Sequence, residues 1–251
     1  MKHLFAAAAV AAGSLLASSA SAAILTGSFD LVGGAPVEVG PDYIDWGAAG
    51  PVFGPSDGDV LFVAGTGDFG AGATYDFTPL PGFPPVFRTG GLKDLNLLTA
   101  PVNTPISIAN FLTSDDYGNL SFTLTHLAAG TGTAAGCGDA PGAVCTPFPQ
   151  SPFTITNSQD GGSGVTVTMA GTVSDGSSSP ASLWKAAFTT QFADLTSGDI
   201  LAMIDDEGFV QASYSANFVL EAPAVPEPAS MVLTGLALSG MAMVIRRRRN
   251  S

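Results

Sequence analysis

The sequence predicts an all-β protein whose body is an antiparallel β-sandwich or jelly roll. Apolar and polar residues alternate with period two over much of the chain, most clearly at 120–125, 165–173 and 210–220, which is typical of half-buried strands. The 31 glycines and 18 prolines follow no Gly-X-Y period, so they indicate many turns and exclude a collagen-like chain. Turn-forming pairs such as Gly33-Gly34 and Asp175-Gly176 separate the alternating segments. Many short strands with such turns favour a single sandwich domain at 23–220.

The expected strands follow one another closely along this domain. In chain order they are 24–31, 43–46, 60–64, 74–78, 92–98, 106–112, 120–125, 153–156, 165–173, 183–192, 200–204 and 210–220. A helical turn is an alternative to strand structure only at residues 195–207.

The N-terminus has the features of a secretory signal peptide at 1–22. Lys2 precedes an apolar run at 4–17, and Ala20 and Ala22 form the small-x-small pair that signal peptidase accepts. We therefore expect cleavage before Ala23 and export of the mature chain. The alternative, an N-terminal membrane anchor, is disfavoured because the run is shorter than the roughly 20 residues that span a bilayer.

The C-terminus combines three features in a fixed order. A linker at 221–230 contains Pro226-Glu227-Pro228, an apolar run follows at 231–245, and a basic tail at 246–251 holds Arg246, Arg247, Arg248 and Arg249. The run predicts a single transmembrane helix about 24 Å long, and the arginines predict that its end stays in the cytoplasm.

This tail resembles the PEP-CTERM sorting signal. The resemblance covers 225–251 and implies recognition by exosortase, an integral membrane protease or transpeptidase of Gram-negative bacteria that make exopolysaccharide. It further implies that Pro226, Glu227 and Pro228 are the recognition motif and that the four arginines are retention charges. The alternative is an ordinary tail anchor with a proline-rich neck.

The charge balance excludes nucleic-acid partners. Eight Lys and Arg residues oppose 21 Asp and Glu residues, and five of those eight basic residues lie near the two ends of the chain. Between Ala23 and Ala224 only Arg88, Lys93 and Lys185 are basic. A body this acidic repels phosphate backbones.

Cys137 and Cys145 are the only cysteines, and we expect them to form a disulfide, since both are exported to an oxidising compartment. Their spacing is not the Cys-x-x-Cys of redox motifs, and a metal site would need the distant His126. Alternation places His126 on the same strand face as Leu120, Phe122 and Leu124, where we expect a structural role.

The sequence contains no motif of a known catalytic class. Gly-x-Ser-x-Gly, His-Glu-x-x-His, a Walker A loop and a Gly-x-Gly-x-x-Gly at a helix start are all missing. We therefore expect a non-catalytic protein. A secreted glycoside hydrolase is an alternative because it needs only two carboxylates. The candidates for such a pair are Asp42, Asp45, Asp115, Asp116, Asp205, Asp206 and Glu207.

A carbohydrate-binding module is the other alternative. Tyr43 and Trp46 lie beside acidic residues and would form an aromatic platform for a sugar if they were exposed. Calcium would assist such binding if loop carboxylates gathered around it. The candidate calcium ligands are Asp57, Asp59, Asp205, Asp206 and Glu207.

Together these features predict an exported protein held at the inner membrane with its body in the periplasm, then delivered to the cell surface or extracellular matrix. Exosortase, signal peptidase and exopolysaccharide are its expected partners. No cofactor other than calcium is expected.

Overall fold

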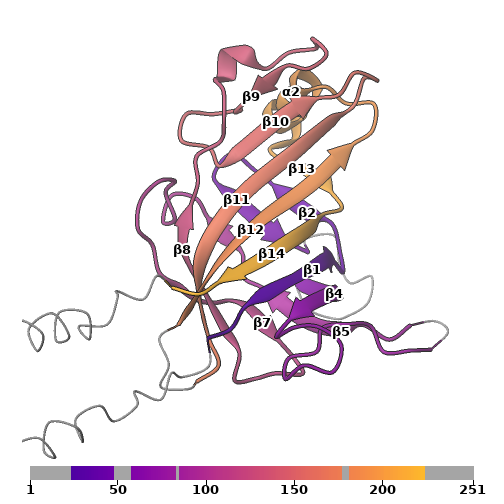
Figure 1. The fold of residues 1–251 in the computed structure, drawn as a ribbon. Coiled ribbons are helices and arrows are strands. Elements are labelled where there is room, and N and C mark those ends of the chain that lie inside the picture. Colours follow the sequence, from indigo (N-terminus) through magenta and orange to yellow (C-terminus); the bar gives the residue numbers. More distant parts are fainter. Residues whose placement is uncertain (1–23, 48–57, 83–84, 177–180, 224–251) are drawn as a thin grey trace, which may run out of the picture.

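The computed structural model describes residues 24–47, 58–82, 85–176 and 181–223, and they form an all-β structure (Figure 1). The first half comprises β1 (Gly27–Gly33), β2 (Val37–Val39), β3 (Tyr43–Trp46), β4 (Asp59–Gly67), β5 (Arg88–Leu92), β6 (Leu95–Asn96), β7 (Ile108–Ser114) and β8 (Ser121–Leu127). The second half comprises η1 (Ala134–Gly136), β9 (Val144–Cys145), β10 (Phe153–Asn157), β11 (Ser163–Ser174), β12 (Ser182–Phe192), α2 (Ser197–Glu207), β13 (Val210–Ala212) and β14 (Ser215–Glu221).

The main sheet closes on itself. Its order is β12-β14-β1-β4-β5-β7-β8-β11, and β11 pairs with β12 to complete an eight-stranded antiparallel barrel. The predicted sandwich is therefore wrong. Alternation with period two is the same in a sandwich and in a barrel, and closure depends on which distant strands pair. Here β12 has partners on both sides, β14 and β11, so the sheet has no free edge at that strand.

Two long strands carry the chain beyond the barrel. β11 and β12 pair over 11 positions and extend upward in Figure 1, where β10 and then β9 continue the sheet next to β11. A second sheet, in the order β13-β2-β3-β6, lies on the inward side of these extensions. We call β9, β10, the upper halves of β11 and β12, α2 and this second sheet the upper region.

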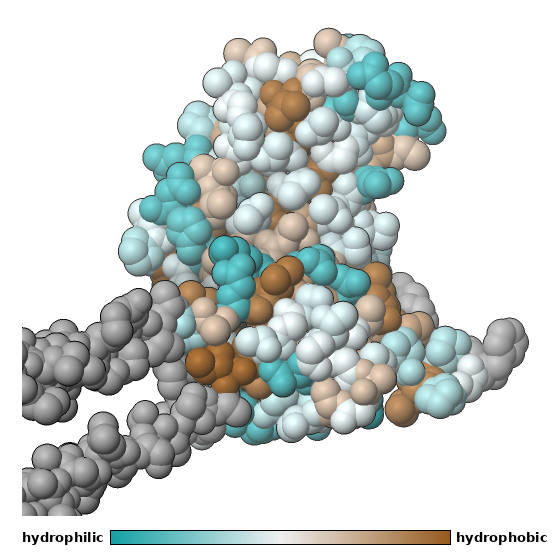
Figure 2. Space-filling model, viewed as in Figure 1, coloured by the Kyte–Doolittle hydropathy of each residue, from teal (hydrophilic) through white to brown (hydrophobic). Residues whose placement is uncertain are grey.

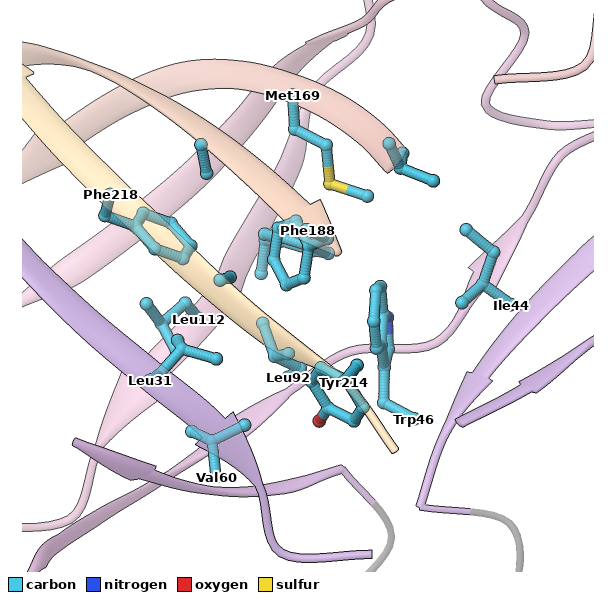
Figure 3. Packing of buried hydrophobic residues seen from close by; sticks show 14 of the residues in the cluster. Leu31, Ile44, Trp46, Val60, Leu92, Leu112, Met169, Phe188, Tyr214 and Phe218 are labelled. Atoms are coloured by element: carbon cyan, nitrogen blue, oxygen red, sulfur yellow. The ribbon is translucent and has the colours of Figure 1, made fainter. Parts of the chain in front are cut away.

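Aromatic side chains fill the barrel. Phe29 lies at their centre, with ring centroids 4.8 to 5.6 Å from five other phenylalanine rings. These neighbours are Phe62, Phe69, Phe77, Phe122 and Phe218. Gly171 lets Trp184 pack closely, because a Cβ there would lie 2.6 Å from the indole ring and 1.9 Å from the Thr123 carbonyl oxygen. Figure 3 shows the junction with the upper region, where Trp46 packs near Phe188 and Tyr214.

Most expected strands are present, but four segments differ. Residues 74–78 form no strand, the expected strand 92–98 contains only the end of β5 and the two-residue β6, and the predicted strand 200–204 is part of α2. The helix begins with a capping box, in which the Thr196 side chain accepts from the Asp199 N–H and the Asp199 carboxylate accepts from the Thr196 N–H. It ends at Gly208, which has a left-handed conformation with φ of 86°.

The fourth difference is in the segment 210–220, which divides into two strands. β13 pairs with β2 in the second sheet, whereas β14 pairs with β1 and β12 in the barrel. Alternation continues through the break, since Tyr214, Ala216 and Phe218 are all buried. The polar pattern therefore gives no sign that the chain changes sheets.

The predicted transmembrane helix is not supported by the structure. No helix among the described residues is both long enough and apolar enough to cross a bilayer. Residues 231–245, where that helix was predicted, lie outside the described part of the chain, as do the signal peptide with Ala20, Ala22 and Ala23. The sorting motif at 226–228 and the arginines at 246–249 also lie outside it.

Candidate binding groove

A polar groove lies in the upper region where the β10–β11 hairpin meets the end of β12. Its volume is about 590 Å³, against about 30 Å³ for each of two narrow apolar cavities beneath the same strands. It is lined by Ser158, Asp160, Gly162, Ser163, Gly164, Gln191, Phe192, Ala193 and Asp194.

Hydrogen bonds within the hairpin shape one wall. The Ser158 N–H donates to the Gly162 carbonyl at 2.7 Å, and the Gly162 N–H donates to the Ser158 Oγ at 3.0 Å. Gly162 also allows β12 to approach, because a Cβ at this position would lie 2.6 Å from the Phe192 carbonyl oxygen. The turn that closes the hairpin thus holds the Ser158 and Asp160 side of the groove next to the end of β12.

The opposite wall is the end of β12 and the residues after it. Gln191 is exposed, and Asp194 has a left-handed backbone with φ of 64°, a conformation that Asp adopts more readily than most residues. Ser163 is only 4% exposed, and its Oγ has no hydrogen-bond partner among the described residues. None of the nine lining residues is basic. The groove offers hydroxyl, amide and carboxylate groups together with apolar surface from Phe192 and Ala193.

The groove continues onto the outer surface of the sheet. Gly164 and Gln191 are register partners, and the next outward-facing row is Thr154, Thr166, Thr189 and Ser215 on four neighbouring strands. We call the outward-facing residues here the hydroxyl face: Thr154, Thr156, Gly164, Thr166, Thr168, Ala187, Thr189, Gln191, Ser215 and Asn217. In Figure 2 the upper part of this surface is mostly pale, which reflects side chains of intermediate hydropathy.

The predicted aromatic platform does not lie on the surface. Trp46 is 2% exposed, with its ring centroid 4.8 Å from that of Phe188, because its position in β3 points into the junction of the two regions (Figure 3). Tyr43 is half-buried, and its hydroxyl donates to Glu38 Oε1 at 2.5 Å. That hydrogen bond, together with burial and the nearby carboxylates, raises the pKa of Tyr43 to about 12. Trp46 therefore offers no face to a sugar.

The candidate calcium ligands do not gather in the described structure. Asp59 begins β4, whereas Asp205, Asp206 and Glu207 lie on the exposed last turn of α2. Asp57 lies outside the described residues. No group of three or more His, Cys, Asp or Glu residues suited to a metal ion occurs in the described part of the chain.

The carboxylates considered for a hydrolase are spread over separate elements. Asp115 and Asp116 follow β7 and contact β5, where the Thr89 hydroxyl donates to Asp115 and Arg88 pairs with Asp116 at 3.0 Å. Asp42 is exposed before β3, and Asp45 is half-buried within it. None of the seven candidates lines the groove.

His126 does not share the inward face of Leu120, Phe122 and Leu124. The register of β8 against β11 shifts between Leu124 and His126, so the next inward side chain is Leu127, which is completely buried. His126 is half-buried opposite Ala170. A β-bulge of this kind reverses the alternation and is not visible in the polar pattern of a short strand.

The disulfide prediction is confirmed. Cys137 and Cys145 are bonded with a Cα–Cα distance of 5.1 Å. The loop between them is also held by Asn157, whose side-chain amide donates to the carbonyls of Gly138 and Ala140. The Asn157 Oδ1 accepts from the Ser197 N–H at 2.8 Å, which attaches the start of α2 to the same residue.

The groove itself was not predicted. Asp160-Gly161-Gly162 is recognisable in the sequence only as a turn, and no signal joins it to Gln191 or Asp194. Their proximity depends on the β11–β12 register. Comparison of the chain with protein-family models, with curated proteins and with solved structures gave no significant match.

Proposed function

We propose that this chain is an exported, non-catalytic component of the cell surface or exopolysaccharide matrix, sorted through its C-terminal signal by an exosortase. The observation that carries the proposal is the order and terminal position of Pro226-Glu227-Pro228, the apolar segment 231–245 and Arg246 to Arg249. The prolines hold the motif extended and remove backbone donors, which favours access by a processing enzyme.

The body of the protein supports export. Its two cysteines form a disulfide, a bond that is stable in oxidising compartments and rare in the cytosol. A signal peptide at 1–22 would deliver the chain to such a compartment. The precursor is retained at the inner membrane with its body in the periplasm until exosortase processes it.

The test is the intact mass and location of the protein in cells with and without an active exosortase. We expect a surface or medium form that begins near Ala23 and ends between Pro226 and Ser230, and we expect it to disappear without the exosortase. A form that ends at Ser251 and stays with the membrane in both strains would overturn the proposal.

A pair of variants separates the motif from general linker effects. Pro226→Ala with Pro228→Ala should block processing, because it removes the recognition motif. Pro223→Ala changes a proline of the same linker outside the motif and should leave processing intact. Equal processing of both variants would contradict recognition of the motif.

A further inference from the structure

We propose that the polar groove and the hydroxyl face form one binding surface for a neutral polysaccharide chain. This inference rests on the proposed function, because it names a ligand through which a matrix protein would hold the matrix. The proposed sugar site lies on the outer side of β10, β11, β12 and β14, whereas the sequence had suggested Tyr43 and Trp46.

The groove and the hydroxyl face are continuous. Thr156, Gly164 and Gln191 form one row across three strands, and the last two also line the groove. Gly164 has no side chain to separate them, and an added Cβ there would have its nearest non-adjacent neighbour 4.0 Å away. The row of Thr154, Thr166, Thr189 and Ser215 lies next, and its three strand spacings of about 4.8 Å span roughly 14 Å.

The chemistry of this surface matches a polyol. Each threonine or serine hydroxyl is one donor and two acceptor sites, and Gln191 adds an amide donor and acceptor. Part of this capacity is used within the protein, since Asn217 Nδ2 donates to Asp30 at 2.7 Å and the Thr154 hydroxyl accepts from the Thr131 N–H at 2.9 Å. The Thr189 and Ser215 hydroxyls contact each other at 3.3 Å, which uses only part of their capacity. Sugar hydroxyls have the same dual character and can replace the water that these side chains otherwise bind.

The charge of the groove and the hydroxyl face favours a neutral polymer over an anionic one. The hydroxyl face contains no charged residue, and charged residues begin only in neighbouring positions such as Lys185, Asp30 and Glu221. The groove adds Asp160 and Asp194 without a basic residue, in a body already strongly acidic. Anionic polymers are therefore repelled, whereas carboxylates accept hydrogen bonds from neutral sugars.

A protein partner fits this surface less well. Ala187 is the only apolar residue of the hydroxyl face; Phe192 in the groove is 9% exposed, and the exposed Val219 lies one row beyond the face, so the surface has no cluster of exposed aromatic and large apolar anchors typical of protein interfaces. The lack of an aromatic platform also predicts weak binding per sugar unit. Long chains should bind better than short ones because many equivalent contacts raise the effective concentration.

The test measures binding of the full protein, purified from whichever cell fraction contains it, to dextran, to short glucan oligomers and to alginate. We expect binding to dextran, weaker binding to the oligomers and none to alginate. The double variant T166V/T189V keeps two β-branched side chains but removes two hydroxyls, and it should weaken dextran binding about tenfold.

A matched control is available on the same strand. Thr123 and Thr172 form another cross-strand threonine pair, between β8 and β11, outside the hydroxyl face. T123V/T172V should leave dextran binding unchanged. No binding to dextran, equal weakening by both double variants, or preference for alginate would each overturn the proposal. Because the assay uses purified protein, its failure is distinct from a failure of sorting.

Discussion

The barrel and the upper region are stabilised by different means. The barrel closes its hydrogen-bonding ladder and packs interlocking aromatic rings around Phe29, with five rings within 5.6 Å. The upper region packs aliphatic side chains such as Val37, Ile200 and Val210 around narrow cavities of about 30 Å³ each. Its outer elements are short and are held by a disulfide and by the Asn157 hydrogen bonds.

This difference shows how a fold can combine a rigid base with a region that carries a surface site. A closed sheet leaves few unpaired backbone groups and needs no other constraint. The short strands β9, β2 and β13 do not form a closed sheet, so a disulfide and side-chain hydrogen bonds hold this region in place. The groove lies in this second, locally held region.

The largest expected effect is the loss of the central ring of the barrel. Phe29→Ala should lower the free energy of unfolding by about 4 kcal/mol, because it leaves a cavity among side chains that cannot collapse. The matched variant in the upper region is Phe153→Ala, a phenylalanine that is also 3% exposed or less but borders existing cavities. We expect its cost to be at least about 1 kcal/mol smaller. Equal costs in chemical denaturation would contradict the comparison.

A smaller effect should come from opening the disulfide. Replacing Cys137 and Cys145 by alanine should destabilise the protein by about 2.5 kcal/mol, since it releases the constraint on a loop closed at a sequence separation of 8.

Amide exchange locates that effect. Exchange should accelerate in β9, β10 and α2 while β1 and β14 keep their protection. If protection fell equally in both regions, the upper region would not be a separately held unit.

The smallest expected effect is the pH dependence of stability that comes from Tyr43. The pKa of Tyr43 is raised to about 12, first by its hydrogen bond to Glu38, so the folded state keeps this hydroxyl protonated above pH 10 while the unfolded state loses the proton. Its stabilising contribution is therefore present below pH 10 and is lost as the pH rises toward about 12. Tyr43→Phe should remove one component from the tyrosinate titration in that range. An unchanged titration would show that Glu38 does not hold this proton.

The sequence predicted the strand at 165–173 well, since alternation there is clear and the whole segment lies in β11. The short segment 43–46 is β3 as expected, and Trp184 and Phe188, four positions apart in β12, are both buried. The helix α2 was read as a strand because Ile200 and Ile204 are four apart, a spacing that fits a short strand as well as one helix face. Thr196 and Asp199, the capping pair, are the sequence signal that could have identified it, whereas the sequence pattern indicated only a helical turn as an alternative at 195–207.

The candidate site was less predictable than the fold. Tyr43 and Trp46 were chosen because aromatic residues bind sugars, but burial of the indole was decided by contacts with Phe188 and Tyr214, 142 and 168 positions away. The groove joins a turn at 158–162 to residues 191–194, which no local pattern connects.

By itself, the sequence determined the all-β class, the disulfide and the acidic body, because alternation, cysteine count and charge are properties of neighbouring or summed residues. The tertiary structure decided that the sheet closes into a barrel, that 210–220 divides between two sheets and that the hydroxyl face joins the groove. Each of these depends on strand pairing between distant segments. Period-two alternation specifies which face of a strand is buried, but it leaves the identity of the neighbouring strand open.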